Sequence, residues 1–343
     1  MKSIVIHAPK DLRIEDHAEE QPGPGQVAVR LATGGVCGTD LHYYHHGGFG
    51  AVRLKQPMIL GHEVSGHIQA LGAGVEDLAV GDLVAVSPSR PCGSCAYCAE
   101  GLPNHCLNMR FYGSAMPFPH IQGAFRQVLV ADAAQCVRAD GLTAGEAAMA
   151  EPLSVCLHAA RRAGELLGKR VLVTGCGPIG LLCIAVARRA GAAEIVATDL
   201  SANALTFGES IGADRVLNVS DDPDGLTPYG ADKGSFDVLF ECTGNEHALA
   251  GAIDVMRPRG IVMQLGLGGD MNVPVQALTA KELSLCGSFR FHEEFPLAVA
   301  MMQKRLIDVA PLITHTVPLA QAETAFHIAS DRAQAIKAQI AFD

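Results

Sequence analysis

The sequence predicts an α/β fold in which a doubly wound parallel sheet domain is inserted into a mainly β domain. Short strand-like runs separated by Gly, Pro and Asp fill roughly the first 150 residues. From about residue 153 onward, apolar strands alternate with helical stretches, and this alternation predicts a parallel sheet. The chain of 343 residues is long enough for two domains, because a single core stops growing near ~250–300 residues.

The N-terminal part contains several runs that predict β-strands. Each is apolar in character and is bounded by turn-forming residues. The runs are "QVAVRLAT" (26–33), "VSGHIQALG" (64–72), "DLVAVSP" (82–88) and "FRQVLVA" (125–131).

The central part predicts strands that are buried on both faces, because they are short and nearly continuously apolar. These strands are "KRVLVTG" (169–175), "EIVATD" (194–199), "DRVLNV" (214–219), "FDVLFEC" (236–242) and "GIVMQLG" (260–266). The helices expected between them are "PIGLLCIAVARRAG" (178–191), "SANALTFGESIG" (201–212) and "NEHALAGAIDVM" (245–256).

The C-terminal tail no longer alternates. It predicts two helices, "EEFPLAVAMMQKR" (293–305) and "LAQAETAFHIAS" (319–330), and a final strand, "AIKAQIAFD" (335–343). We expect this tail to return to the first domain. The expected division is therefore 1–152 with 291–343 for one domain, and 153–290 for the inserted one.

Composition argues against several classes of function. A net charge of −10 argues against nucleic acid as a partner, because such proteins usually carry a basic face. The N-terminus lacks the apolar core of a signal peptide, and no apolar run approaches the ~20 residues of a membrane span. The odd count of 11 cysteines favours a reducing cytoplasm, where thiols bind metals or fill cores.

A glycine-rich segment predicts a dinucleotide site. Gly175, Gly177 and Gly180 form the pattern G-x-G-x-x-G between an apolar strand and a helix. These glycines allow the backbone to approach a pyrophosphate at the positive end of the helix. Pro178, followed by Ile179, suits the first helical turn, where a missing N–H costs nothing.

Asp199 predicts the preferred nucleotide. It ends the next strand, 19 residues beyond Gly180, where an acid can bind both hydroxyls of the adenosine ribose. Asp199 would repel a 2′-phosphate, and the following Leu200 offers no positive charge. NAD is therefore expected over NADP, although Asp199 could instead cap the next helix.

A cysteine cluster in residues 89–107 predicts a structural zinc lobe. Four thiolates in one compact lobe can close a tetrahedral shell around zinc, and a closed shell leaves no position for a substrate. Disulfides are the alternative, which the reducing compartment disfavours. The four cysteines are Cys92, Cys95, Cys98 and Cys106.

Four further residues could bind a second metal, although none is distinctive alone. Cys37 could fill a core, and His62 could be an ordinary hydrogen-bonded histidine. Glu63 follows His62 directly, and Glu151 precedes a proline where it could cap a helix.

Taken together, the motifs resemble the zinc-containing medium-chain dehydrogenases over essentially the whole chain. "CGTDLHYYHHGGFG", "GHEVSGHI", the cysteine lobe, "AEPLSV", "GCGPIG" and "GSFRF" occur in the order found in that family. Within it, "EPLSV" and "HYY" resemble the polyol branch, and "MRFYGSAMPFPHIQGAF" resembles a member that oxidises a sugar acid to its keto form. The resemblance implies a GroES-like catalytic domain around a Rossmann domain.

The resemblance also implies a catalytic zinc on Cys37 and His62, completed by a carboxylate and water. It leaves open whether Glu63 or Glu151 is the ligand. Zinc would act as a Lewis acid on the substrate hydroxyl, and NAD would accept the hydride. Thr39 and His42 match the groups that pass the hydroxyl proton to solvent, although His42 could be an ordinary residue of a His-rich loop.

Other roles implied by the resemblance concern the cofactor and the substrate. Tyr43 should line the substrate pocket. Alcohol dehydrogenases use a second Cys in place of the carboxylate ligand, and Cys156 lies close to Glu151 in the sequence, but we expect Cys156 to serve helix packing. Relatives often have an Arg where this chain has Ala204, which weakens the argument for NAD affinity. The segments expected to cover the nicotinamide are Leu265-Gly266-Leu267 and Ser288-Phe289-Arg290.

Three functions remain open. In the first, a sugar-acid dehydrogenase, Arg290 or Arg110 would pair with the substrate carboxylate, since an unpaired buried charge is costly. Alternatively, Arg290 would bind polyol hydroxyls or the cofactor, and Arg110 would be an ordinary surface charge. A neutral polyol dehydrogenase is the second, and a non-catalytic NAD-binding sensor with only the structural zinc is the third. The family forms dimers and tetramers, so a homo-oligomer is expected.

Overall fold

The computed structural model describes residues 1–342 and contains two compact units. The first unit comprises Met1–Glu151, His292–Asp331 and the stretch from Lys337 to the end of the described chain. The second comprises Pro152–Phe291 and Arg332–Ile336. None of the helices in residues 1–342 has the length and apolar composition of a membrane span.

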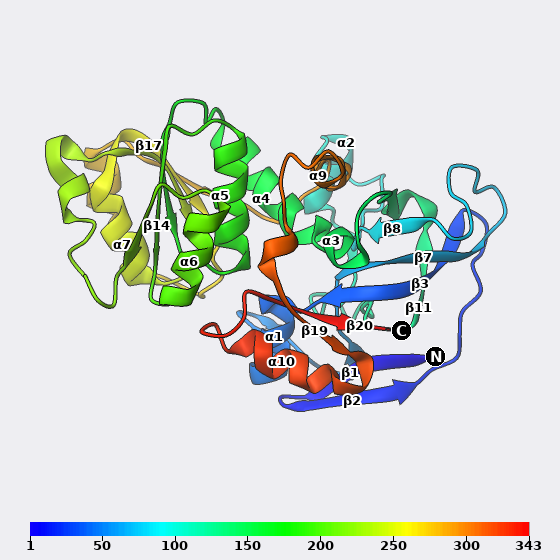
Figure 1. Ribbon diagram of the computed structural model, residues 1–343. Helices are drawn as coiled ribbons and strands as arrows, with labels where there is room; N and C mark the ends of the chain where they lie inside the picture. The colour runs from blue at the N-terminus through cyan, green and yellow to red at the C-terminus, as the bar shows by residue number, and fades with distance from the viewer. Residues whose placement is uncertain (343) are drawn as a thin grey trace. The chain divides into compact units, whose positions relative to one another are not determined.

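The first unit is organised around a seven-stranded sheet, drawn on the right of Figure 1. Strand β3 (Gln26–Gly35) is central: it pairs with β7 (Glu63–Leu71) along one edge. Its other edge is shared by β11 (Val128–Asp132) and β20 (Lys337–Ala341). The sheet is completed by β8 (Leu83–Val86), β12 (Cys136–Arg138) and β19 (Ile313–Pro318).

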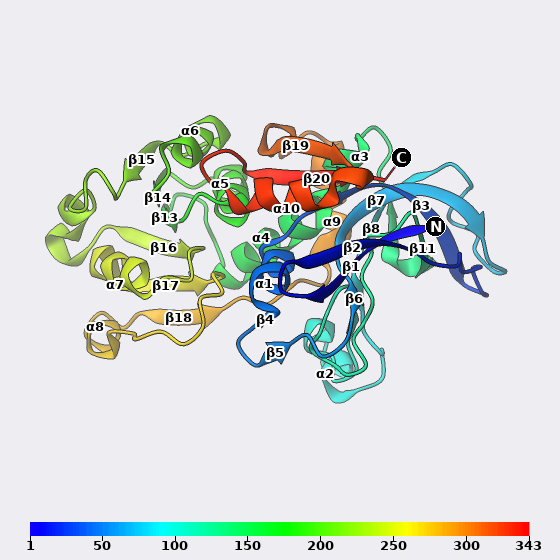
Figure 2. The same cartoon turned by 90° about the horizontal axis from the view of Figure 1, so that it is seen from below.

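Smaller elements surround this sheet, and Figure 2 shows the lobe that contains α2 set apart from it. A three-stranded sheet consists of β1 (Lys2–Ala8), β2 (Asp11–Asp16) and β6 (Met58–Ile59). Two strand pairs join β4 (Gly48–Phe49) with β5 (Val52–Arg53), and β9 (Ser89–Arg90) with β10 (Arg110–Phe111). The helices are α1 (Gly38–His46), α2 (Ala96–Ala99), α3 (Ala144–Ala148), α9 (Glu294–Gln303) and α10 (Ala322–Ser330).

The second unit is a six-stranded, all-parallel sheet in the order β15-β14-β13-β16-β17-β18. Its strands are β13 (Arg170–Thr174), β14 (Glu194–Asp199), β15 (Arg215–Asn218), β16 (Phe236–Glu241), β17 (Met256–Gln264) and β18 (Ser284–Gly287). Figure 1 shows α5 (Pro178–Arg189) and α6 (Ala202–Ile211) on one face and α7 (Glu246–Val255) on the other. The remaining helices are α4 (Ala150–Ala163), which begins at the boundary between the units, and α8 (Val275–Ala280).

The predicted fold class is confirmed: one unit is mainly β, and the other is built on a parallel sheet with helices. Val171, Leu172 and Val173 of β13 are fully buried, because helices cover both faces of a parallel sheet. The tail segments form α9, α10 and β20, and β20 joins the main sheet of the first unit.

Candidate metal and cofactor sites

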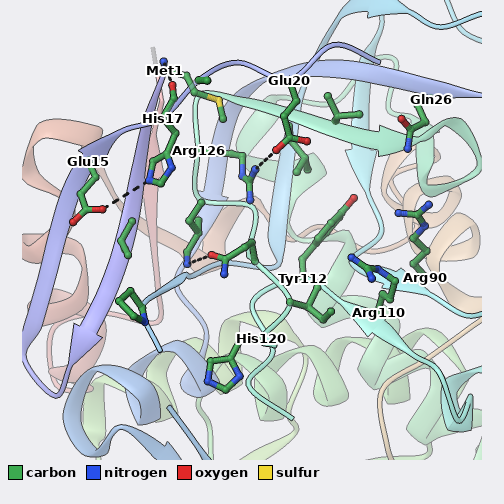
Figure 3. Close-up of a pocket in the computed structure, with 18 of the residues that line it drawn as sticks. Met1, Glu15, His17, Glu20, Gln26, Arg90, Arg110, Tyr112, His120 and Arg126 are labelled. Carbon is green, nitrogen blue, oxygen red and sulfur yellow. Dashed lines mark hydrogen bonds and ion pairs between the residues drawn. The ribbon is translucent and has the colours of Figure 1, made fainter. Parts of the chain in front are cut away.

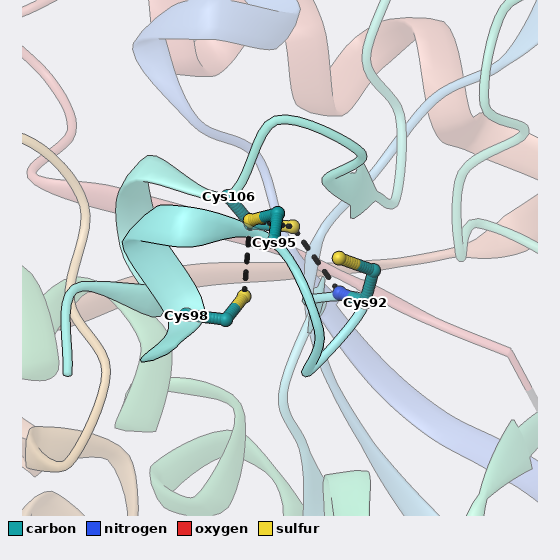
Figure 4. A group of neighbouring side chains, drawn as sticks. All are labelled: Cys92, Cys95, Cys98 and Cys106. Atoms are coloured by element: carbon teal, nitrogen blue, oxygen red, sulfur yellow. Dashed lines mark hydrogen bonds between the residues drawn. The ribbon is translucent and has the colours of Figure 1, made fainter. Parts of the chain in front are cut away.

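The four cysteines of the lobe converge on one point, as Figure 4 shows. Their ligand atoms all lie within 4.8 Å of one another. The Sγ atom of Cys95 lies 3.5 Å from that of Cys98 and 3.9 Å from that of Cys106. A tetrahedron with Zn–S bonds of about 2.3 Å has sulfur–sulfur edges of about 3.8 Å, so this group fits zinc.

The chemistry of these thiols also suits a metal. Hydrogen bonds from the Ser94 backbone and the Asn108 side chain lower the pKa of Cys92 to about 5. Desolvation and the neighbouring Cys95 thiol raise the pKa of Cys98 to about 12. A bound cation removes this asymmetry because zinc binds thiolates and displaces their protons.

A second group joins Cys37, His62 and Glu63, whose ligand atoms also lie within 4.8 Å of one another. Cys37 precedes α1, His62 directly precedes β7, and Glu63 begins β7. His62 and Glu63 are only 4% and 1% exposed. A thiol, an imidazole and a carboxylate suit zinc, and three protein ligands leave a fourth position for a substrate.

The Asp40 carboxylate supports the group of Cys37, His62 and Glu63. Its Oδ2 accepts from the Cys37 backbone N–H at 3.1 Å, and its Oδ1 accepts from that of Gly61 at 3.2 Å. The same Oδ1 lies 3.8 Å from Nδ1 of His62, a buried atom with no hydrogen-bond partner among the described residues. A carboxylate behind a histidine is a common support for a metal ligand.

Burial and neighbouring charges shift the pKa values of Asp40 and His62 in opposite directions. Burial raises the pKa of Asp40, and the charge of His62 opposes the rise. Burial would lower the pKa of His62, but Asp40 and then Cys37 raise it well above its usual range. The acidic neighbours that raise the pKa of His62 would also favour a divalent cation at this position.

Lys337 is the residue that sequence reasoning missed. Its Nζ donates to both oxygens of Glu63, at 2.9 and 2.8 Å, and to the Val36 carbonyl. Burial would lower the pKa of Lys337, but Glu63 and then Cys37 raise it. No local sequence pattern predicts this ion pair, because 274 residues separate Lys337 from Glu63.

The structure places the other residues expected around the metal on or beside helices. Thr39 and His42 are half-buried in α1, three positions apart and hence on one face of the helix. Tyr43 is buried, and its hydroxyl accepts from the Ala115 backbone N–H at 3.0 Å. Glu151 is 7% exposed in the first turn of α4 and lies outside the Cys37 group, although its charge acts on His62.

In the second unit, the glycine loop has the geometry that a dinucleotide needs. Gly175 adopts φ +88 and Gly177 caps α5, which starts at Pro178. A Cβ on Gly180 would lie 1.7 Å from the Gly175 carbonyl oxygen, so only glycine lets the helix approach the turn. Ile179 is half-buried, and its carbonyl accepts from the buried thiol of Cys156.

Asp199 lies at the end of β14 beside this loop. Its Oδ2 accepts from the Cys176 backbone N–H at 2.6 Å, and its Oδ1 accepts from that of Ser201 at 2.8 Å. The carboxylate is thus fixed at the carboxyl edge of the parallel sheet, where nucleotides bind in open α/β folds. Leu200 is 69% exposed, which leaves an apolar surface next to the carboxylate.

Two further segments reach the same edge of the sheet. The backbone N–H groups of Leu265 and Gly266 donate to the Glu241 carbonyl, each at 2.9 Å. Leu267 is exposed, and the Ser288 hydroxyl oxygen is buried without a partner among the described residues. The following pair has a distinctive geometry. Arg290 adopts φ +56, and its guanidinium lies 4.8 Å from the ring centroid of the half-exposed Phe289.

Arg110 lies elsewhere in the first unit. It is paired with Arg90 across two short strands, and both line a cavity of about 770 Å³ that Figure 3 shows. Its neighbour Phe111 is buried, with its ring 5.7 Å from that of His62. Because successive residues of a strand face opposite sides, Arg110 points away from the Cys37 group.

Two family models match the chain. One describes an alcohol dehydrogenase GroES-like domain, at residues 23–141, and the other a zinc-binding dehydrogenase, at residues 178–304.

Among individual relatives, the chain is 41% identical to L-idonate 5-dehydrogenase (NAD(P)(+)) of Escherichia coli strain K12, covering 99% of this chain and 98% of that protein. It is 38% identical to sorbitol dehydrogenase of Homo sapiens, covering 94% and 91%. The crystal structure of the E. coli K-12 L-idonate 5-dehydrogenase matches with a TM-score of 0.95 at 40% identity, covering 99% of this chain and 98% of that one.

Proposed function

Because the chain belongs to the zinc-containing medium-chain dehydrogenases, we propose that its substrate is the sugar acid L-idonate, which it oxidises to 5-keto-D-gluconate. The chain is a zinc-dependent oxidoreductase that acts on CH–OH groups with NAD(P) as cofactor. The observation that supports this reaction best is the convergence of Cys37, His62 and Glu63 separately from the closed cysteine group.

Cys37, His62 and Glu63 hold the catalytic zinc in this proposal, and Glu151 acts on the site through its charge. Each carboxylate oxygen has two lone pairs, so Glu63 can bind a metal while it accepts from Lys337. When bound, zinc supplies Lewis acidity toward the substrate hydroxyl. The lobe zinc on Cys92, Cys95, Cys98 and Cys106 is structural.

The chain must also remove a proton from the substrate hydroxyl. Thr39 Oγ1 takes part in a hydrogen-bonded path, and the His42 imidazole carries the proton onward to solvent, since histidine titrates near neutral pH. Tyr43 lines the substrate pocket. The common face that Thr39 and His42 share on α1 supports this assignment.

The nucleotide lies along the glycine loop with its ribose hydroxyls on Asp199 and Leu200 beside it. Gly175, Gly177, Pro178, Ile179 and Gly180 provide the pyrophosphate turn. NAD is preferred over NADP, because the fixed Asp199 carboxylate repels a 2′-phosphate. The segments 265–267 and 288–290 contact the nicotinamide.

The substrate carboxylate pairs with Arg290. Arg110 is the weaker candidate, because it faces a cavity away from the Cys37 group. A positive φ is unusual for arginine and is frequent where side chains serve a ligand. The second candidate function, a neutral polyol dehydrogenase, is supported by the sorbitol dehydrogenase relatives and needs no such cation.

The experiment compares L-idonate with the neutral L-iditol and sorbitol, on the parent enzyme, Arg290→Met and its control Arg110→Met. We expect the highest kcat/KM for L-idonate. Arg290→Met should reduce that value at least tenfold more than those for the neutral polyols, whereas Arg110→Met should change all three alike. Equal losses on charged and neutral substrates would remove the carboxylate role from Arg290. Faster turnover of sorbitol by the parent enzyme would favour the polyol function.

Further features of the protein follow from the same proposal. It works in the cytoplasm as a homodimer or homotetramer, with domains divided at 1–152 with 291–343 and 153–290. An oligomer is supported by β18, an edge strand whose Leu285 is 42% exposed, because open sheet edges favour pairing. A non-catalytic sensor would need only the four-cysteine group, so the second metal group argues against it.

A further inference from the structure

Glu241 is a completely buried carboxylate in the centre of the nucleotide-binding unit. It ends β16, the strand between β13 and β17, and is 0% exposed. Its direct neighbours across the sheet are Thr174 on one side and Gln264 on the other. The carboxylate therefore sits where the carboxyl ends of three strands meet.

Each hydrogen-bond donor to the Glu241 carboxylate is an uncharged group. Gln264 Nε2 donates to Oε2 at 2.6 Å, and the Gly244 backbone N–H donates to the same oxygen at 3.0 Å. Oε1 accepts from the Thr243 backbone N–H at 2.8 Å and from the Thr243 hydroxyl. The Thr174 hydroxyl is a longer contact at 3.4 Å.

Among the described residues, no lysine, arginine or histidine forms an ion pair with Glu241. A buried charge is normally paired with an opposite charge, because its desolvation is costly. Dipoles hold the Glu241 carboxylate in place without neutralising it. Its negative charge therefore remains available to act on whatever binds at this edge of the sheet.

The same carboxylate lies under the segment expected to face the nicotinamide. A Cβ on Gly266 would lie 2.7 Å from Glu241 Oε2 and 2.1 Å from the Gly244 nitrogen. Gln264 Nε2 donates to the Gly266 carbonyl as well as to Glu241. The strip Leu265–Leu267 is thereby fixed directly over the charge.

We propose that Glu241 is a positioning residue that orients this strip and whose fixed charge favours the oxidised cofactor. The nicotinamide ring is a cation when oxidised and neutral after it accepts a hydride, so a nearby negative charge stabilises the oxidised form selectively. This inference rests on the proposed function, because it needs a nicotinamide against Leu265–Leu267.

The test measures Kd for NAD+ and for NADH by titration calorimetry on the zinc-loaded enzyme and its variants. Glu241→Gln removes the charge and nearly preserves the shape. It should weaken NAD+ binding about tenfold, the scale expected for unit charges several ångströms apart in a partly screened site, and NADH binding less than about threefold. Glu241→Asp keeps the charge and shortens the side chain, so both forms should weaken together and the NADH/NAD+ Kd ratio should persist.

Two further variants complete the test. Glu194→Gln removes a charge from the opposite end of the sheet, where Glu194 pairs with Arg170, and should leave the ratio within twofold. The double variant Glu241→Gln with Gln264→Glu exchanges amide and carboxylate, keeps the charge at the site and should restore most of the ratio. It also provides the test if Glu241→Gln alone fails to fold.

A double variant that loses the parent's NADH/NAD+ Kd ratio would overturn the electrostatic role and leave NAD(P) dependence intact. An unchanged ratio in Glu241→Gln would do the same. A parent enzyme that binds neither nucleotide would overturn the proposed cofactor site and this inference together.

Discussion

Lys337 brings a positive charge into the core of the first unit, where it is 2% exposed. Its ion pair with Glu63 is fully removed from water. A buried pair contributes little net stability compared with an apolar pair, but loss of one partner leaves an uncompensated buried charge. Replacing one partner should therefore lower the free energy of unfolding much more than replacing both partners.

Lys337→Met should lower the free energy of unfolding of the first unit in the metal-free protein by about 3–5 kcal/mol. Lys337→Met with Glu63→Met should recover most of that loss. Urea denaturation followed by intrinsic tyrosine fluorescence gives both values. Arg13→Met, which breaks an exposed pair with Asp11, should cost less than about 1 kcal/mol and is the matched control. A single variant as stable as the parent would contradict this reading.

At the scale of single residues, sequence patterns located some site residues much better than others. Gly180 was identified from a motif whose spacing reflects a steric requirement, and the structure shows the close contact. The side of the strand on which Arg110 lies depends on its pairing with Arg90. The residues next to Arg110 in the sequence do not predict that pairing. The bond from Gly61 to Asp40 and the ion pair of Lys337 with Glu63 also arise only when separate segments pack together.

At the scale of elements, helix α1 presents three histidines with different surroundings. His42 is half-buried, with its ring 5.8 Å from that of Phe49. His46 is exposed in the last turn. His42 follows Thr39 by one helical turn, whereas His46 follows it by two turns, so the helix offers its own control for the proton path.

His42→Ala should reduce kcat for alcohol oxidation about 10- to 100-fold near neutral pH, because the relay loses its proton acceptor. The loss should shrink as pH rises, since hydroxide in solvent can then take the proton directly. His46→Ala should follow the parent profile. A pH–rate profile from about pH 6 to 10 distinguishes the variants. Parallel profiles for His42→Ala and the parent would exclude His42 from the path.

The elements themselves were largely predictable. The β13 and β14 strands are apolar runs bounded by turn residues, and the helix of the glycine loop starts at Pro178 as expected. Very short strands such as β9 and β10 were not identified, because two residues carry no periodicity. Their pairing is nevertheless what directs Arg110 and Phe111 to opposite sides.

At the scale of the whole molecule, two metal groups of different chemistry lie in one unit. Four sulfurs form a closed set, whereas Cys37, His62 and Glu63 leave a position open. Loss of zinc from the four-cysteine group should therefore lower stability, whereas loss of zinc from the Cys37 group should lower activity.

Metal analysis of the purified protein should give about two zinc ions per chain. Cys37→Ser should lose one zinc and nearly all activity, with little change in the melting temperature. Cys98→Ser should lose the other zinc and lower the melting temperature by several degrees, because structural zinc sites contribute folding free energy. Plasma emission spectroscopy and thermal melts measure both effects. One zinc per chain in the parent protein would contradict the two-site assignment.

The pairing of β20 with β3 also has a consequence for biosynthesis. Ribosomes deliver the chain from its N-terminus, so Cys37, His62 and Glu63 emerge at least 274 residues before Lys337. Until β20 has been synthesised, Glu63 lacks its cation and β3 lacks part of one edge. A nascent chain can therefore expose all three metal ligands before the site is complete, and the site is completed when β20 pairs with β3.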